Sequence, residues 1–167
     1  MMSSSSSSSS SSDVQNIWFN DVDGEAVESL LDKLEDKEAK ACKDIAEDFF
    51  QQQNIDMAMF CLATASAKDP NLADIERCKQ AYVAHKVVSK KSKMRNWPYV
   101  VLGIKDYGVG VEEIERSYKR KALMFHPDKF SSVAANTAMK HINAAREILS
   151  DSRTRNALHK VMQNLRV

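Results

Sequence analysis

The chain has 167 residues, of which 43% are hydrophobic and 28% charged, and its formal net charge is +1. This length allows one ordinary domain or two small ones, and the composition is that of a soluble globular protein. With only four glycines and three prolines, and with Ala, Leu, Lys and Glu abundant, the chain favours helices over strands. We therefore expect an all-α fold.

The cysteines and the apolar runs restrict the kind of protein further. Cys42, Cys61 and Cys78 are odd in number and widely spaced, which suggests neither a disulfide framework nor a zinc site. We expect no metal, no cofactor and a reducing compartment. No apolar run approaches the roughly 18 to 20 residues that span a bilayer, and the N-terminus lacks the features of a secretory signal. The expected location is cytoplasmic, with the nucleus also open.

The charge changes sign along the chain. Residues 1–22 contain an uninterrupted serine tract and are expected to be a disordered tail. Residues 1–88 carry 8 Lys and Arg against 16 Asp and Glu, a net charge of −8, whereas residues 89–167 carry 16 against 7, a net charge of +9. The change of sign predicts a domain boundary. An acidic partner should meet the second half of the chain.

Residues 23–88 predict an acidic helical module, because apolar residues recur there at steps of three and four. Residues 24–52 predict one helix or two in series, and a second run begins at Ile55. A third helix is expected from Asp69, as N-cap, and Pro70, at the first helical position. Three antiparallel helices would form either a tetratricopeptide-like module, with a groove for a client or adaptor, or a plain bundle without a ligand.

A short basic segment, residues 89–96, follows this module. It holds Lys90, Lys91, Lys93 and Arg95 without apolar periodicity, which is typical of a linker. A nuclear-import signal or a nucleic-acid contact is the alternative for such a cluster. No aromatic residues are interleaved for base stacking, so nucleic acid is not the expected partner.

Residues 97–167 predict four helices. A short apolar helix begins at Trp97 and ends before a glycine-bearing loop, and a long one begins near Val111. Pro127 ends the long helix, because proline disfavours helical geometry in the residue before it. The third helix is expected from about Val133 to Leu149 and the last from about Arg153.

This part of the chain resembles a J-domain from Trp97 to about Lys160. The matching residues of the first two helices are Tyr99, Leu102, Gly103, Ile114, Tyr118, Lys119, Arg120, Ala122 and Leu123. Those of the loop and the third helix are His126, Pro127, Asp128, Lys129, Met139, Ile142, Asn143, Ala145, Ile148, Leu149, Ser150, Asp151 and Arg155. A His-Pro-Asp tripeptide alone is a modest motif, but between two helices in the right order it becomes specific.

The resemblance implies a four-helix unit with an antiparallel helix II/III hairpin and the tripeptide in the exposed connecting loop. It also implies a co-chaperone that binds an Hsp70-type chaperone and stimulates its ATP hydrolysis, without being an enzyme itself. The implied Hsp70-binding residues are His126, Pro127, Asp128, Tyr118, Arg116, Lys119, Arg120 and Lys129. Arg116, Lys119 and Arg120 cluster on one helix, which would speed encounter with an anionic surface.

Three positions depart from the family pattern and keep an alternative open. Lys121 stands in place of a usual buried leucine, although its stem could lie along apolar surface with the charge in water. Arg146 replaces a usual tyrosine and Ser152 a usual proline. The alternative is a J-like interaction or scaffold protein with weak or no Hsp70 stimulation.

Two other interpretations of the tripeptide were weighed. Asp128 could merely cap the loop or pair with Lys129, with His126 stabilised at the helix end. A catalytic His126–Asp128 pair is less favoured, because residues two apart around a proline rarely face one another and no nucleophile is placed beside them.

The N-terminal helices are loosely similar to the helical region before the J-domain in a group of plant J-domain proteins. The residues that carry this similarity are Lys43, Ile45, Ala46, Phe49, Phe50, Ala65, Pro70, Leu72 and Tyr82.

Overall fold

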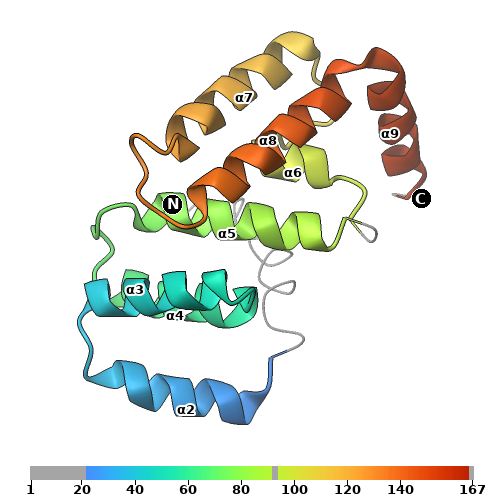
Figure 1. Cartoon of the computed structure of the whole chain (residues 1–167). Coiled ribbons are helices and arrows are strands. Elements are labelled where there is room, and N and C mark those ends of the chain that lie inside the picture. Colours follow the sequence, from blue (N-terminus) through green and yellow to red (C-terminus); the bar gives the residue numbers. More distant parts are fainter. Residues whose placement is uncertain (1–21, 92–93, 166–167) are drawn as a thin grey trace, which may run out of the picture. The chain divides into compact units, whose positions relative to one another are not determined.

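The computed structural model describes residues 22–91 and 94–165. Throughout these residues the regular elements are all helices, so the expectation of an all-α fold is confirmed. The helices form two compact units that divide between Leu72 and Ala73 (Figure 1). The serine-rich tail expected at residues 1–22 lies almost entirely outside the described residues.

The first unit consists of three helices: α2 (Gly24–Glu35), α3 (Ala39–Gln51) and α4 (Ile55–Lys68). Residues 24–52 therefore form two helices in series. The N-terminus of α2 is capped by Asp23, whose Oδ1 accepts from the Glu25 amide at 3.2 Å, and Asn54 caps α4 through the Met57 amide at 3.3 Å. α3 and α4 lie side by side, and α2 packs on α4.

Lys68, the last residue of α4, binds the C-terminal end of α2. The Lys68 ammonium donates to the carbonyls of Leu34, Glu35 and Lys37 at 2.7, 2.8 and 2.6 Å. Leu34 and Glu35 belong to the last turn of α2, so the cation also interacts favourably with the negative end of the helix dipole. The buried apolar residues of this unit are Leu30, Leu34, Cys42, Ala46, Phe50, Ala58, Met59, Cys61, Leu62 and Ala65.

The prediction that a helix begins at Asp69 and Pro70 is wrong. Asp69 is instead the C-cap of α4, and its Oδ1 accepts from the Asn71 amide at 3.0 Å. A short acidic side chain that binds the backbone two residues on stabilises a turn in competition with a helix. The next helix, α5 (Ile75–Ser89), begins only after Asp74, which has a left-handed φ of 63°.

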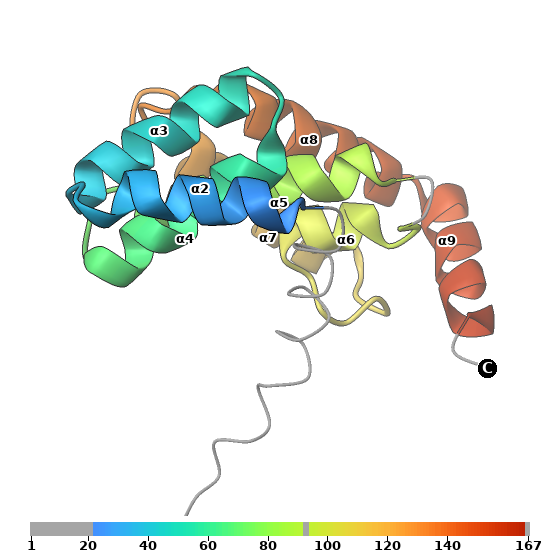
Figure 2. The ribbon, with the colours of Figure 1, turned by 90° about the horizontal axis from the view of Figure 1, so that it is seen from below.

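The second unit consists of α5, α6 (Trp97–Leu102), α7 (Val111–Phe125), α8 (Ala135–Ser150) and α9 (Ser152–Asn164). α8 contacts each of the other four helices, and α7 and α8 form a hairpin (Figure 1). α9 leaves this hairpin at an angle (Figure 2). The fully buried large side chains of this unit are Tyr82, Tyr99, Leu102, Ile114, Phe125, Phe130, Ile142 and Leu149.

α5 therefore packs with the second unit, on α8 and α6, whereas the change of charge sign predicts a domain boundary between residues 88 and 89. A change in net charge along the chain does not require a change in packing at the same place. The expected basic linker begins as a turn at residues 90–91, and residues 92–93 lie outside the described part of the chain.

Individual residues at the helix ends of the second unit account for where these helices begin and end. α6 ends at Gly103, whose left-handed φ of 74° favours glycine. α8 and α9 are joined by Asp151 alone, whose Oδ2 accepts from the Thr154 amide at 3.2 Å. Ser152 is the first residue of α9, a position that accepts proline and serine alike. Its departure from the family pattern thus leaves the joint intact. No helix in the described residues is long and apolar enough to cross a membrane.

Candidate functional site

The loop between α7 and α8 is held at both ends by buried phenylalanines. Phe125 ends α7 and is 0% exposed, and Phe130 is 1% exposed, with their ring centroids 6.4 Å apart. The four residues between them, His126 to Lys129, are all exposed. The core thus fixes where the chain leaves α7 and where it returns, and only the short segment between the rings faces solvent.

Hydrogen bonds within this loop define its conformation. His126 has an extended backbone (φ −61°, ψ 128°), as a residue before proline requires. Its carbonyl accepts from the Lys129 and Phe130 amides at 2.9 and 3.0 Å. Its Nδ1 accepts from the Asp128 amide at 3.2 Å, which places the proton of the neutral ring on Nε2. The loop is therefore a closed turn organised around His126.

The Asp128 side chain is 88% exposed. Its Oδ2 lies 3.7 Å from His126 Nδ1, but that nitrogen is occupied as the acceptor of the Asp128 amide. A neutral His126 therefore forms no ion pair with the carboxylate. The geometry leaves an acidic side chain presented to a partner on an ordered backbone.

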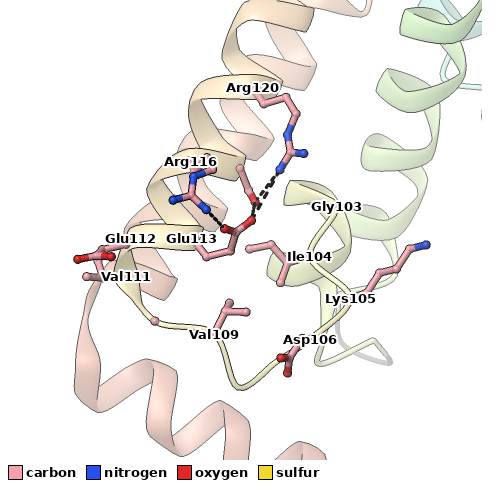
Figure 3. Close-up of a pocket in the computed structure, with 12 residues that line it drawn as sticks. Gly103, Ile104, Lys105, Asp106, Val109, Val111, Glu112, Glu113, Arg116 and Arg120 are labelled. Atoms are coloured by element: carbon pink, nitrogen blue, oxygen red, sulfur yellow. Dashed lines mark hydrogen bonds and ion pairs between the residues drawn. The ribbon is translucent and has the colours of Figure 1, made fainter.

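Three basic residues, Arg116, Lys119 and Arg120, share the exposed face of α7 at steps of three and four residues. Arg116 pairs with Glu113 at 2.5 Å, and Arg120 lies 3.9 Å from the other oxygen of the same carboxylate. Glu113 thus sits between the two arginines, at the edge of an open hollow of about 770 Å³ between α7 and residues 103–110 (Figure 3). Glu113 is not among the site residues predicted from the sequence, and its carboxylate offsets some of the positive charge of this surface.

Leu123 is a second residue that the site prediction omitted. It lies four residues after Lys119, on the same face of α7, and its side chain is 64% exposed. A leucine with this exposure offers apolar contact area next to the basic residues of α7. Its spacing from Arg116, Lys119 and Arg120 was visible in the sequence, so periodicity would have found it.

Tyr118 faces α8 rather than the basic face. Its hydroxyl donates to Asn143 Oδ1 at 2.7 Å, and the Arg146 guanidinium lies over its ring at 4.5 Å. Arg146 also donates to Glu115 at 2.8 Å, and this hydrogen bond holds the pKa of the Glu115 carboxyl below its usual value. Arg146 therefore links α7 to α8 through a cation–π contact and an ion pair.

Lys121 points toward α5. Its ammonium donates to Gln80 Oε1 and lies 5.9 Å from the centroid of the Phe125 ring. Burial lowers the pKa of this lysine. The expectation that its charge reaches water is thus wrong in part, because the ammonium hydrogen-bonds to Gln80 on α5.

Comparison with known proteins identifies the fold. Residues 97–158 match the family model of the DnaJ domain, which covers α6, α7, α8 and the first part of α9. This match and the geometry of the α7–α8 loop define the class: the C-terminal part of the chain is a J-domain. Over this part of its length the chain is similar to DnaJ-type proteins.

Several relatives among curated proteins carry the DnaJ name. Over 110 residues the chain is 31% identical to the DnaJ homolog subfamily C member 7 homolog of Dictyostelium discoideum, covering 62% of this chain and 19% of that protein. Over 63 residues it is 41% identical to DnaJ homolog subfamily C member 5 of Tetronarce californica, covering 37% and 32%. The Translocation protein sec63 of Schizosaccharomyces pombe is 35% identical over 81 residues, 44% of this chain and 13% of that protein.

The chain thus spans a third or less of the length of these relatives. No solved structure gives a significant match. The resemblance to a J-domain is confirmed, whereas the binding role of each site residue stays a prediction. The structure brings His126, Pro127, Asp128 and Lys129 together in one exposed loop, and it sets Tyr118 apart from the other α7 residues predicted to bind.

Proposed function

We propose that the chain binds an Hsp70-type chaperone and stimulates its ATP hydrolysis through the His126-Pro127-Asp128 loop. The observation that carries this proposal is the exposed Asp128 carboxylate on a turn closed by His126 and anchored by two buried phenylalanines. A preorganised loop of this kind loses little entropy when it binds. The ATP is hydrolysed in the partner, so this chain shifts the conformational equilibrium of the partner.

Each part of the surface has a separate task in this proposal. Arg116, Lys119 and Arg120 attract an acidic surface of the nucleotide-binding domain and speed the encounter, with Lys129 adding positive charge beside the loop. Asp128 then pairs with a cationic group near the interdomain linker of the chaperone, as the J-domain resemblance implies. Pro127 restricts the backbone and His126 holds the turn closed.

The experiment is an ATPase titration of a purified Hsp70 with the full chain and with His126→Gln. The variant should retain the helical circular-dichroism spectrum and lose the stimulation, because the glutamine side chain does not reproduce the imidazole acceptor that closes the turn. Glu147→Gln is the matched control, an exposed residue of α8 away from the loop, and should stimulate like the wild type. Equal stimulation by His126→Gln and Glu147→Gln would overturn the role of the loop.

A scaffold protein with the same fold and weak stimulation is the second candidate. Glu113 favours it, because this carboxylate pairs with Arg116 and approaches Arg120 and so weakens the attraction of α7 for an acidic surface. In that case Hsp70 would bind with low affinity, and its ATP turnover would be the same with and without the chain at saturating concentrations. Stimulation that depends on His126 would exclude this candidate.

Two further proposals concern the location of the protein and the role of the first unit. We propose a cytoplasmic location, with the nucleus as a second possibility, because Cys42, Cys61 and Cys78 form no disulfide within the described residues and disulfides are rare in reducing compartments. We also propose that α2, α3 and α4 select a client or adaptor, with exposed Leu31 as a contact. Fluorescence microscopy of the tagged full chain tests the location, and the same experiment with Leu31→Ser tests the contact at Leu31.

A further inference from the structure

One residue outside the matched J-domain reaches the candidate loop. Arg77 lies near the start of α5, and its Nη1 donates to the backbone carbonyl of Lys129 at 2.6 Å. The same nitrogen contacts Asp74 Oδ1 at 3.2 Å. The family match begins only at residue 97, so this contact comes from a helix that the J-domain pattern does not include.

We propose that Arg77 is a positioning residue for the His126–Lys129 loop, and that α5 is a working part of the Hsp70-stimulating unit. This inference rests on the proposed function. Arg77 acts through the backbone of Lys129 and touches neither His126 nor Asp128 in any recorded contact. Its role is to restrict how the Asp128 carboxylate is presented.

The bond complements the contacts that the loop makes with itself. The inner side of the turn is closed by the His126 carbonyl and Nδ1. The Lys129 carbonyl belongs to the peptide between Lys129 and Phe130, one residue after Asp128, and the guanidinium of Arg77 binds it from outside the turn. A hydrogen bond from a charged donor is stronger than one between neutral groups. Arg77 therefore fixes the orientation of this peptide from the side that the turn itself does not hold.

α5 is well placed to serve as a fixed support. It packs on α8 and α6, and it makes polar contacts with α7 and α8 besides the contact of Arg77 with the loop. Gln80 accepts from the Lys121 ammonium of α7, and His85 Nδ1 lies 3.0 Å from His141 Nε2 of α8. Asp74 in turn orients the Arg77 guanidinium. The loop is thus hydrogen-bonded to α5, and α5 in turn contacts both α7 and α8.

The test compares Arg77→Ala, Arg77→Lys and Lys79→Gln in the full chain. Lys79 is the matched control, because it lies on α5, pairs with Glu76 at 3.6 Å and has no recorded contact with the loop. In the Hsp70 ATPase titration, Arg77→Ala should lower the maximal stimulation by about threefold to tenfold. The half-saturating concentration should change by less than about twofold, because the basic face of α7 still drives the encounter. Arg77→Lys should recover part of the maximal stimulation.

A second readout requires no chaperone. Heteronuclear NOE values of the Asp128, Lys129 and Phe130 amides in ¹⁵N-labelled protein should fall in Arg77→Ala and stay at the wild-type level in Lys79→Gln, with the thermal midpoints of both variants alike. If the wild type stimulates no Hsp70, the proposed function fails, and the NOE values still decide whether Arg77 orders the loop. Unchanged loop NOE values in Arg77→Ala, or equal maximal stimulation by Arg77→Ala and Lys79→Gln, would overturn the inference.

Discussion

Two charged side chains occupy positions where the J-domain pattern has large apolar or aromatic residues, and each has acquired a partner. Arg146 lies over Tyr118 and pairs with Glu115, so it replaces an apolar contact between α7 and α8 with polar ones. Lys121 hydrogen-bonds to Gln80 on α5. The two positions differ in exposure. The Arg146 side chain is 45% exposed, whereas Lys121 is partly buried, and this burial lowers its pKa.

We predict that Lys121→Leu raises the free energy of unfolding by about 1 kcal/mol, because a partly buried cation costs more to desolvate than one hydrogen bond returns. Gln80 keeps a contact of its own, since its Nε2 donates to Glu76 at 2.9 Å. Urea denaturation measures the effect, with exposed Lys160→Leu as the control. A loss of more than about 1 kcal/mol would mean that the bond to Gln80 outweighs the desolvation.

A pair of histidines links α5 to α8. His85 Nδ1 and His141 Nε2 are 3.0 Å apart. Burial, and less strongly the neighbouring His85 and Lys140, lower the pKa of His141 from 6.5 to about 4, and burial lowers the pKa of His85. Both rings are therefore neutral in the folded chain at pH 7, with one donating and one accepting.

This pair predicts a loss of stability in mild acid. Between pH 6.5 and about 4 His141 binds a proton in the unfolded chain but not in the folded chain. The contribution of its neutral ring to the free energy of unfolding is therefore complete above pH 6.5 and falls as the pH falls. The whole shift corresponds to about 3 kcal/mol, and solvent screening of a half-buried ring reduces this to about 1–2 kcal/mol. Urea denaturation at pH 7.5 and 5.0 measures it. His141→Gln should remove most of the pH dependence, and a variant with the wild-type dependence would contradict this assignment.

At the scale of one element, α7 carries both the cations that attract a partner and a carboxylate that restrains them. Glu113 pairs with Arg116 and lies within 3.9 Å of Arg120 (Figure 3). Glu112 lies beside it in the first turn of the same helix. The two glutamates have equal charge and nearly equal positions along the helix dipole, so they form a matched pair for a test.

We predict that Glu113→Gln speeds association with Hsp70 by about twofold to fivefold at low salt, and that Glu112→Gln speeds it less. The difference should shrink above about 0.5 M salt, where exposed charges are screened. Stopped-flow or surface-plasmon measurements of the association rate at several salt concentrations check this. Equal rates for both variants would show that the ion pairs of Glu113 do not restrain the arginines.

The helices from Trp97 to Leu149 could be predicted from the sequence because each has an apolar stripe and a clear stop, such as Gly103 or Pro127. The start of α5 could not, because Asp69 and Pro70 are equally compatible with a helix start and with the turn that the Asn71 amide selects. The α7–α8 loop was predicted on its motif. The contact of Arg77 with Lys129 joins residues far apart in the chain, and the periodicity of apolar residues along the sequence does not predict such a contact.

At the scale of the whole molecule, the described chain consists of a three-helix unit and a five-helix unit. The J-domain match covers only part of the second unit, and α5 completes it by packing on α6 and α8. The proposed Hsp70-binding surface includes the α7–α8 loop of this unit. Arg77, which lies well before the matched segment, contacts this loop through the Lys129 carbonyl.

The central claim is that the exposed Asp128 carboxylate transmits stimulation to an Hsp70. Single-turnover hydrolysis of ATP preloaded on the chaperone tests it most directly, with the full chain and Asp128→Asn compared at equal concentration. We predict that the wild type accelerates hydrolysis by at least about tenfold and that Asp128→Asn, although equally helical, leaves the rate near its basal value, because a neutral amide loses the ion pair. No acceleration by the wild type with any Hsp70 of its own organism, or equal acceleration by Asp128→Asn, would contradict the account.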